Sequence, residues 1–316
     1  MVYRLDPPGT DDDDSVGVTN YVLPVYAATC TTTTTNLRLH QPPKDHETCP
    51  EECKTPHLLL WFFDSRGGWE YQQHTTNPTN PTNPPTHANA TGRVGRPNWV
   101  HPDVASWFKN TSAAITRNNN QLIIPQMAFM HIPTSGFLEA QKRGIDPSLY
   151  PGINDDSPLS IQAQGWCPDG TVTQNDSCKY GGHDRAIMQA LTSTPGMMAV
   201  FAGHDHGDTW CYNWDGKYTA KDDSWRGGVS GDPLPMNTTG KGDGNINLCF
   251  GQHTGYGGYG KWKRGARQVV ASLEKLKQFT LDTHIRLEGG AVIGAVSLNA
   301  TYGQDKYPTT PNDKDP

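Results

Sequence analysis

The sequence lacks an apolar run long enough to cross a membrane, a basic stripe and any Cys-x-x-Cys pair. A membrane-spanning helix needs about 20 consecutive apolar residues, so no membrane span is expected. The net charge of −6 argues against nucleic acid as a partner. Without a Cys-x-x-Cys pair, neither a zinc ribbon nor a thioredoxin motif is indicated. The first residues have no apolar signal core, so this chain is expected to carry no signal peptide.

Apolar residues are also scarce, at 34% of the chain, whereas glycine and proline are plentiful at 33 and 25 residues. This balance predicts long irregular connections between rather few core elements. Residues 1–15 form an acidic polar leader, and residues 303–316 a polar tail that we expect to be disordered. We predict flexible insertions at about 27–55, which holds a threonine run, and 71–97, where Asn-Pro-Thr repeats.

The seven cysteines and five Asn-x-Ser/Thr sequons together favour an oxidising, secretory compartment. The candidate glycosylation sites are Asn89, Asn110, Asn175, Asn237 and Asn299. An odd number of cysteines leaves at least one thiol unpaired within the chain. We predict a disulfide between Cys211 and Cys249, because both lie in β-rich segments that antiparallel pairing could bring together. Cys167 and Cys178 are a second candidate pair, which would close a loop.

Three short apolar runs predict buried strands, at 57–65, 122–130 and 197–202. Helical patterns separate them, the longest opening at Pro102 with an acid in its first turn and one apolar face. After residue 206 the pattern becomes β-rich. This alternation predicts an α/β fold.

Histidines follow two of these predicted strands. His131 comes after the second, and His204 and His206 come after the third, separated by one residue. Ligands in open α/β sheets bind at the carboxyl ends of the strands, and neutral imidazole is a common metal ligand. An isolated His-x-His pair more often has no ligand, but the strand before it and the second strand with a histidine favour a metal site. Three histidines alone would suit zinc, whereas a hydrolytic two-metal site also needs carboxylates.

Several segments together resemble the calcineurin-like metallophosphoesterases, in a fungal branch related to purple acid phosphatases. They are FMHIP and AGHDH around the histidines, with TNYVLP, LLLWFFDSRGG, PGINDD, GHDHGDTWCYNWDG, NLCFGQHTGYGGYG and a RLEGG–SLN–TYG ending. The resemblance implies an αββα sandwich and a phosphoester substrate, either a small molecule or a phosphoprotein. It implies that His131 and His204 bind one metal of a pair and His206 the other, the metals being iron, manganese or zinc.

The chain departs from this family in its metal-binding motifs. The family motifs D-x-H, G-D-x-x-D and G-N-H-[DE] are not found before TNYVLP. Residues 16–302 therefore look like the C-terminal portion of the phosphoesterase domain, truncated on its N-terminal side. A truncated gene model and a shortened pseudo-enzyme would both explain this. We expect little or no hydrolysis by the chain alone, and a secreted or vacuolar parent protein.

A glycine-rich stretch at 251–260 is the remaining candidate for a site. His253 and Tyr256 could line a substrate pocket, or the loop could pack its tyrosines on its own surface. The alternative to a hydrolase is a secreted, glycosylated binding or structural protein without catalysis. The nine tryptophans and the glycine-rich stretch of this chain could suit contact with carbohydrate.

Overall fold

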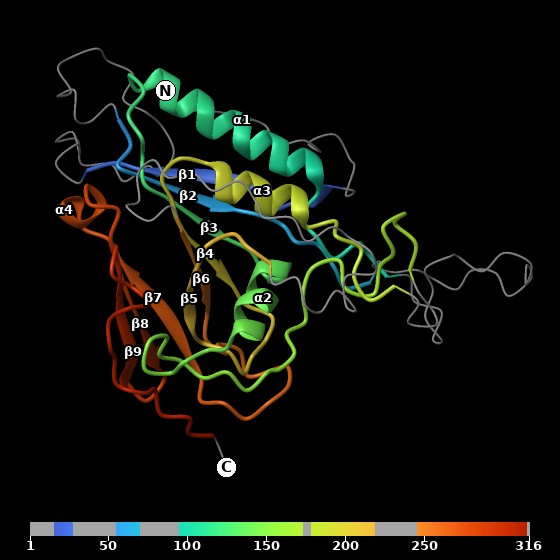
Figure 1. Cartoon of the computed structure of the whole chain (residues 1–316), viewed down its shortest axis with the longest axis vertical. Helices are drawn as coiled ribbons and strands as arrows, with labels where there is room; N and C mark the ends of the chain where they lie inside the picture. Colours follow the sequence, from blue (N-terminus) through green and yellow to red (C-terminus); the bar gives the residue numbers. More distant parts are fainter. Residues whose placement is uncertain (1–15, 28–54, 70–94, 173–177, 219–244, 315–316) are drawn as a thin grey trace, which may run out of the picture.

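The computed structural model describes residues 16–27, 55–69, 95–172, 178–218 and 245–314 (Figure 1). Within these ranges the strands form a six-stranded and a three-stranded sheet. The larger sheet has the order β1-β2-β3-β4-β6-β5. Its strands are β1 Tyr21–Val25, β2 Leu58–Phe62, β3 Gln126–Phe129, β4 Met197–Ala202, β5 Cys211–Trp214 and β6 Ile246–Phe250. The strands β2, β3, β4 and β6 are parallel, and β1 and β5 pair antiparallel at the two edges.

Helices cover one face of this sheet. They are α1 Pro102–Asn118, α2 Ser135–Arg143 and α3 Arg185–Ser193, with α1 and α3 side by side in Figure 1. Proline begins α1, and the ring of His101 accepts a hydrogen bond from the Asp103 amide, which caps the helix. The apolar face of α1 buries Val104 and Phe108 against the sheet, where Trp61 is fully buried. The expected α/β class is confirmed.

The other face of the sheet is covered in part by the second sheet, at the lower left of Figure 1. Its strands are β7 Gly265–Val270, β8 Leu281–Leu287 and β9 Val292–Leu298, with a short helix, α4 Leu273–Leu276, after β7. Residues of β4, β5 and β6 share a buried cluster with Leu281, Val296 and Leu298. Arg267 of β7 joins the sheets, because its guanidinium donates to the carbonyls of Phe250 and Thr209 and to the Thr283 hydroxyl.

Both predicted disulfides are present. Cys211 and Cys249 are directly opposed partners on β5 and β6, with Cα atoms 4.0 Å apart. Cys167 and Cys178 close a loop with a Cα separation of 4.9 Å. Antiparallel pairing of the two β-rich segments therefore produced the cross-strand bridge, as expected.

A row of aromatic rings crosses the less covered half of the second face. Tyr21, Phe62, Phe129 and Phe201 stand in register on β1 to β4, with ring centroids 4.6, 5.0 and 5.2 Å apart along the row. Phe201 is buried, whereas Tyr21 at the edge is 42% exposed. Leu23 of β1 is likewise 43% exposed, so apolar surface faces outward here in the described structure.

The structure bears on the edge strand, the C-terminal tail and the membrane span. Pro24, which has no N–H to donate to a neighbouring strand, lies in the edge strand β1. The expectation of a disordered tail is wrong for residues 303–314, since the amide of Tyr307 donates to the Ser148 carbonyl and Asn312 donates to Asp155. A polar composition did not prevent order, because the tail pairs its polar groups with a neighbouring loop. No helix among the described residues is long and apolar enough to cross a membrane.

Other expectations fall wholly or mostly outside the described residues. These are the leader at 1–15, nearly all of the insertions at 27–55 and 71–97, and the sequons at Asn89, Asn175 and Asn237. Of the remaining sequons, Asn110 is exposed on α1. The side chain of Asn299 accepts hydrogen bonds from Thr301, so it forms part of a turn. Glycosylation stays a prediction at all five positions.

Candidate functional site

The candidate site lies at the carboxyl ends of three adjacent parallel strands. His131 follows β3 by two residues, and His204 follows β4 by two residues. The glycine-rich stretch begins at Gly251, directly after β6. Parallel strands end at the same sheet edge, so the topology β3-β4-β6 brings these segments together.

His131 and His204 form a close pair. The Nε2 atom of His131 lies 3.2 Å from Nδ1 of His204, and the Gly203 amide donates to the His131 carbonyl at 2.9 Å. Loss of hydration, then the neighbouring histidines, lower the pKa of both rings. Neutral imidazole offers a lone pair to a cation. With metal–nitrogen bonds of 2.0–2.1 Å, two ligands on a tetrahedral ion would have nitrogens about 3.3 Å apart, which is close to the observed spacing.

The backbone of His204 adopts an unusual conformation. Its φ is +72°, in the left-handed region that favours glycine. A non-glycine residue held there costs on the order of 1 kcal/mol, and such residues gather at functional sites. This strain supports a role for the side chain, because glycine would meet the backbone requirement more easily.

His206 does not join this pair directly. Its ring is stacked between His253, with centroids 4.0 Å apart, and Tyr259, with centroids 4.3 Å apart. Its Nδ1 lies 2.9 Å from the carbonyl oxygen of Tyr259. Only a protonated Nδ1 can donate to a carbonyl, so the neutral ring keeps its lone pair on Nε2.

The two residues expected to bind substrate have different surroundings. His253 is buried, with Nε2 3.2 Å from the Gly257 carbonyl and Nδ1 3.1 Å from the guanidinium of Arg264. Both its ring nitrogens are thus engaged inside the loop, which favours a supporting role over contact with substrate. Tyr256 is 78% exposed, and its hydroxyl donates to Glu288. Substrate binding by either residue stays a prediction.

A group of aspartates lies behind the histidines. Burial, and to a lesser extent the charge of Asp156, raises the pKa of Asp205 to about 7, although the Ser160 amide partly opposes this. Burial, then the charges of Asp205 and Asp156, raises the pKa of Asp208 to about 9. Asp155 is exposed and Asp156 half-buried, and both carboxylates accept hydrogen bonds. Asp156 accepts from the Gly207 amide and the Tyr259 hydroxyl, and Asp155 from the Trp262 indole.

These donors fit a cation only in part. The described residues contain no group of three or more His, Cys, Asp or Glu side chains arranged to hold a metal ion. The pair of His131 and His204 fits two positions around a single ion. A binuclear centre does not fit the described residues, because no carboxylate there completes or bridges it.

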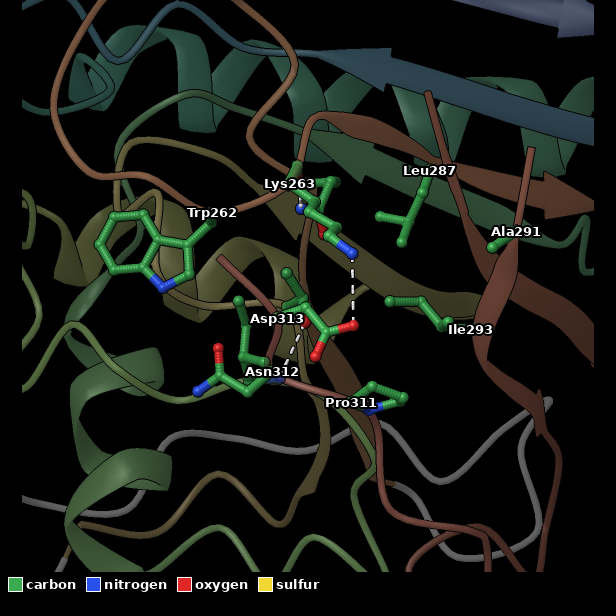
Figure 2. A pocket seen from close by; sticks show the side chains of 11 residues that line it. Trp262, Lys263, Leu287, Ala291, Ile293, Pro311, Asn312 and Asp313 are labelled. Carbon is green, nitrogen blue, oxygen red and sulfur yellow. Dashed lines mark hydrogen bonds and ion pairs between the residues drawn. The ribbon is translucent and has the colours of Figure 1, made fainter. Parts of the chain in front are cut away.

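A separate pocket of about 180 Å³ lies next to the same loops. Figure 2 shows Leu287, Ala291, Ile293 and Pro311 lining it, with Lys263 directed toward Asp313. The two charged groups are 3.3 Å apart. None of the histidines discussed above lines this pocket, so it is distinct from the candidate site.

Comparisons with known proteins give one distant similarity. The chain is 24% identical over 189 residues to a protein of Arabidopsis thaliana named "Probable inactive purple acid phosphatase 29". The match covers 57% of this chain and 35% of that protein, so the chain spans about a third of the length of this relative. No protein-family model matches the chain. No solved structure matches it significantly.

Sequence reasoning missed Arg264, which contacts His253, and did not foresee that Tyr259 contacts His206. The glycine-rich stretch drew attention to the loop, but Tyr256 and Tyr259 look alike in the sequence. Their different contacts depend on how the loop turns at Gly257 and Gly258, which residue spacing does not reveal.

Proposed function

We propose that the chain is part of a phosphoester hydrolase of the calcineurin-like superfamily, built on an αββα sandwich, and that it contributes the histidine side of the metal site. The observation that carries this proposal is the placement of His131 and His204 at neighbouring strand ends with facing nitrogens 3.2 Å apart. The similarity to the protein named "Probable inactive purple acid phosphatase 29" supports phosphoester hydrolysis as the type of reaction.

In this proposal His131 and His204 hold one iron, manganese or zinc ion, and His206 offers Nε2 as a further ligand. A cation held there would neutralise charge on a phosphoryl oxygen of the substrate. The lowered pKa values keep the paired imidazoles neutral, so they need not lose protons before binding. Iron, manganese and zinc accept imidazole readily, whereas calcium prefers oxygen ligands.

We further propose that residues 1–316 alone hydrolyse phosphoesters slowly or not at all. Two-metal hydrolysis requires two ions and a bound water in fixed geometry, and the described residues supply no bridging carboxylate. Losing one electrostatic element of such a site commonly costs about 3–4 kcal/mol of barrier. Several of these electrostatic groups, including a bridging carboxylate, are missing among the described residues.

The two disulfides are consistent with an extracellular or secretory protein. With the sequons, they lead us to propose a secreted or vacuolar location and glycosylation of accessible asparagines. Asn110 is the clearest candidate among the described sequons, since its side chain is exposed on α1.

The proposal is tested by titrating the chain with Zn²⁺ or Mn²⁺ by calorimetry and by assaying an aryl phosphate. We expect one ion per chain, binding at least tenfold more weakly in His131→Ala, and little turnover. The matched control is His284→Ala on β8, whose ring faces Gln268 and should leave binding unchanged.

Two results would contradict the proposal. Absence of binding, or binding indifferent to His131, would favour the glycosylated binding protein without catalysis. Rapid turnover that is lost in His204→Ala would show a complete site formed with ligands outside the described residues, and would overturn the expectation of inactivity.

A further inference from the structure

The loop after β6 encloses His206 on several sides. We define the glycine loop as residues 251–264, from the end of β6 to the start of β7. Its members His253 and Tyr259 cover the two faces of the His206 ring, with interplanar angles of 21° and 10°. The three rings form one stack, so the imidazole cannot rotate without displacing a neighbour.

Tyr259 contacts His206 through its ring, its carbonyl oxygen and its hydroxyl. Its ring stacks on the imidazole, and its carbonyl oxygen lies 2.9 Å from Nδ1. Its hydroxyl accepts a hydrogen bond from the His206 amide at 3.0 Å and donates to Asp156. Asp156 also accepts from the Gly207 amide at 2.7 Å, which fixes the backbone after His206. The side chain and the main chain of His206 are therefore held by the same tyrosine.

His253 is itself held from behind. Arg264 donates to Nδ1 of His253 and to the Trp262 carbonyl. The opposite ring nitrogen of His253 faces the Gly257 carbonyl at 3.2 Å. A donor on Nδ1 and an acceptor at Nε2 select one neutral tautomer, with the proton on Nε2. This arrangement gives His206 a fixed stacking partner.

The backbone of the loop also touches His206. A Cβ atom at Gly258 would lie 2.4 Å from Cε1 of His206, and Gly258 has φ of +89°. Only glycine permits this approach. Gly257 is the opposite case, since a Cβ there would meet no atom within 4 Å.

We propose that the glycine loop is a positioning device for His206, which holds its ring in one orientation and in the Nδ1-protonated tautomer. The Nε2 atom then carries the lone pair and has no hydrogen-bond partner among the described residues. The use of this lone pair to bind a cation rests on the proposed function, whereas the tautomer and orientation do not. Tyr259, His253 and Arg264 are positioning residues in this scheme. Loop partners of this kind fix the geometry of metal-binding histidines in many sites.

The decisive variant is Gly258→Ala, which pushes on the imidazole. Gly257→Ala controls for a methyl group in the same loop. Gly290→Ala controls for backbone strain, because Gly290 also has φ of +89° but an added Cβ there would meet nothing. Tyr259→Phe removes the hydroxyl while keeping the stacked ring and the carbonyl.

The first measurement is a long-range ¹H–¹⁵N spectrum of the metal-free chain with labelled histidine, with the His206 signal assigned by its loss in His206→Gln. We expect a single Nδ1-protonated tautomer in the wild type and in both control variants. Gly258→Ala should give a mixture or a changed ring environment, and Tyr259→Phe should shift the His206 amide while keeping the tautomer. A wild-type mixture of tautomers, or a Gly258→Ala spectrum identical to the wild type, would overturn the proposal.

The second measurement adds Zn²⁺ alone. We expect Zn²⁺ to shift Nε2 of His206, with affinity reduced tenfold or more by Gly258→Ala and unchanged in the controls. If Zn²⁺ shifts only His131 and His204, the ligand role of His206 is overturned while the positioning role stands. If Zn²⁺ does not bind, the proposed function fails, and the metal-free spectra still decide the positioning role.

Discussion

Replacing Arg267 by methionine should destabilise the fold by about 3 kcal/mol, an estimate that balances a burial cost against three hydrogen bonds. Burial lowers the pKa of Arg267 well below its usual value, to about 10. At about 1.4 kcal/mol per pKa unit, this burial costs roughly 3.5 kcal/mol at neutral pH. Three hydrogen bonds from a charged donor contribute about 1.5–3 kcal/mol each, or roughly 4.5–9 kcal/mol together. The interactions therefore outweigh the cost.

The methionine side chain approximates the aliphatic stem but leaves the carbonyls of Phe250 and Thr209 without their donor. The assay is chemical denaturation with the disulfides intact, read from the midpoint at constant slope. Arg286→Met is the control, since Arg286 is exposed on the adjacent strand β8 and its loss should change stability by less than about 0.5 kcal/mol. If Arg267→Met is as stable as the wild type, the guanidinium does not join the sheets in the way described.

Two further predictions concern the residues around the histidines. The pKa of Asp208 is raised to about 9 by burial and then by Asp205, so its stabilising contribution falls as pH rises from about 4 to about 9. Asp208→Asn should therefore gain more stability over the wild type at pH 8 than at pH 5, measured by thermal unfolding; a larger gain at pH 5 would contradict the sign. His204→Gly relieves the positive φ and should keep or raise stability by up to about 1 kcal/mol while removing Zn²⁺ binding. A loss of more than 1 kcal/mol would show that the histidine ring stabilises the fold.

Strand positions and the histidine pair were predictable because they depend on local patterns. A continuous apolar run such as Met197–Ala202 has one stable environment, the interior of a parallel sheet, and it became the buried strand β4. Once two such strands are parallel neighbours, the residues that follow them must meet. The adjacency of His131 and His204 follows from that topology.

The environment of His206 and the order of the tail were not predictable in the same way. Both depend on contacts between segments far apart in the chain. Asp155 accepts from Trp262, Asn312 and Lys314, which are more than 100 residues away. Nothing in the polar sequence after residue 303 marks Asp155 as its partner, so composition suggested disorder.

The aromatic row on β1 to β4 has a consequence for how the protein behaves in solution. Tyr21 and Leu23 present apolar surface at the rim of the sheet, and concentrated samples should associate through it, with light scattering that grows with concentration. Pro24 lies in the same edge strand and has no N–H group, so it weakens strand-to-strand addition there. The expected complexes are thus reversible, face-to-face oligomers that mild detergent disperses, in place of fibres that grow by extending the sheet.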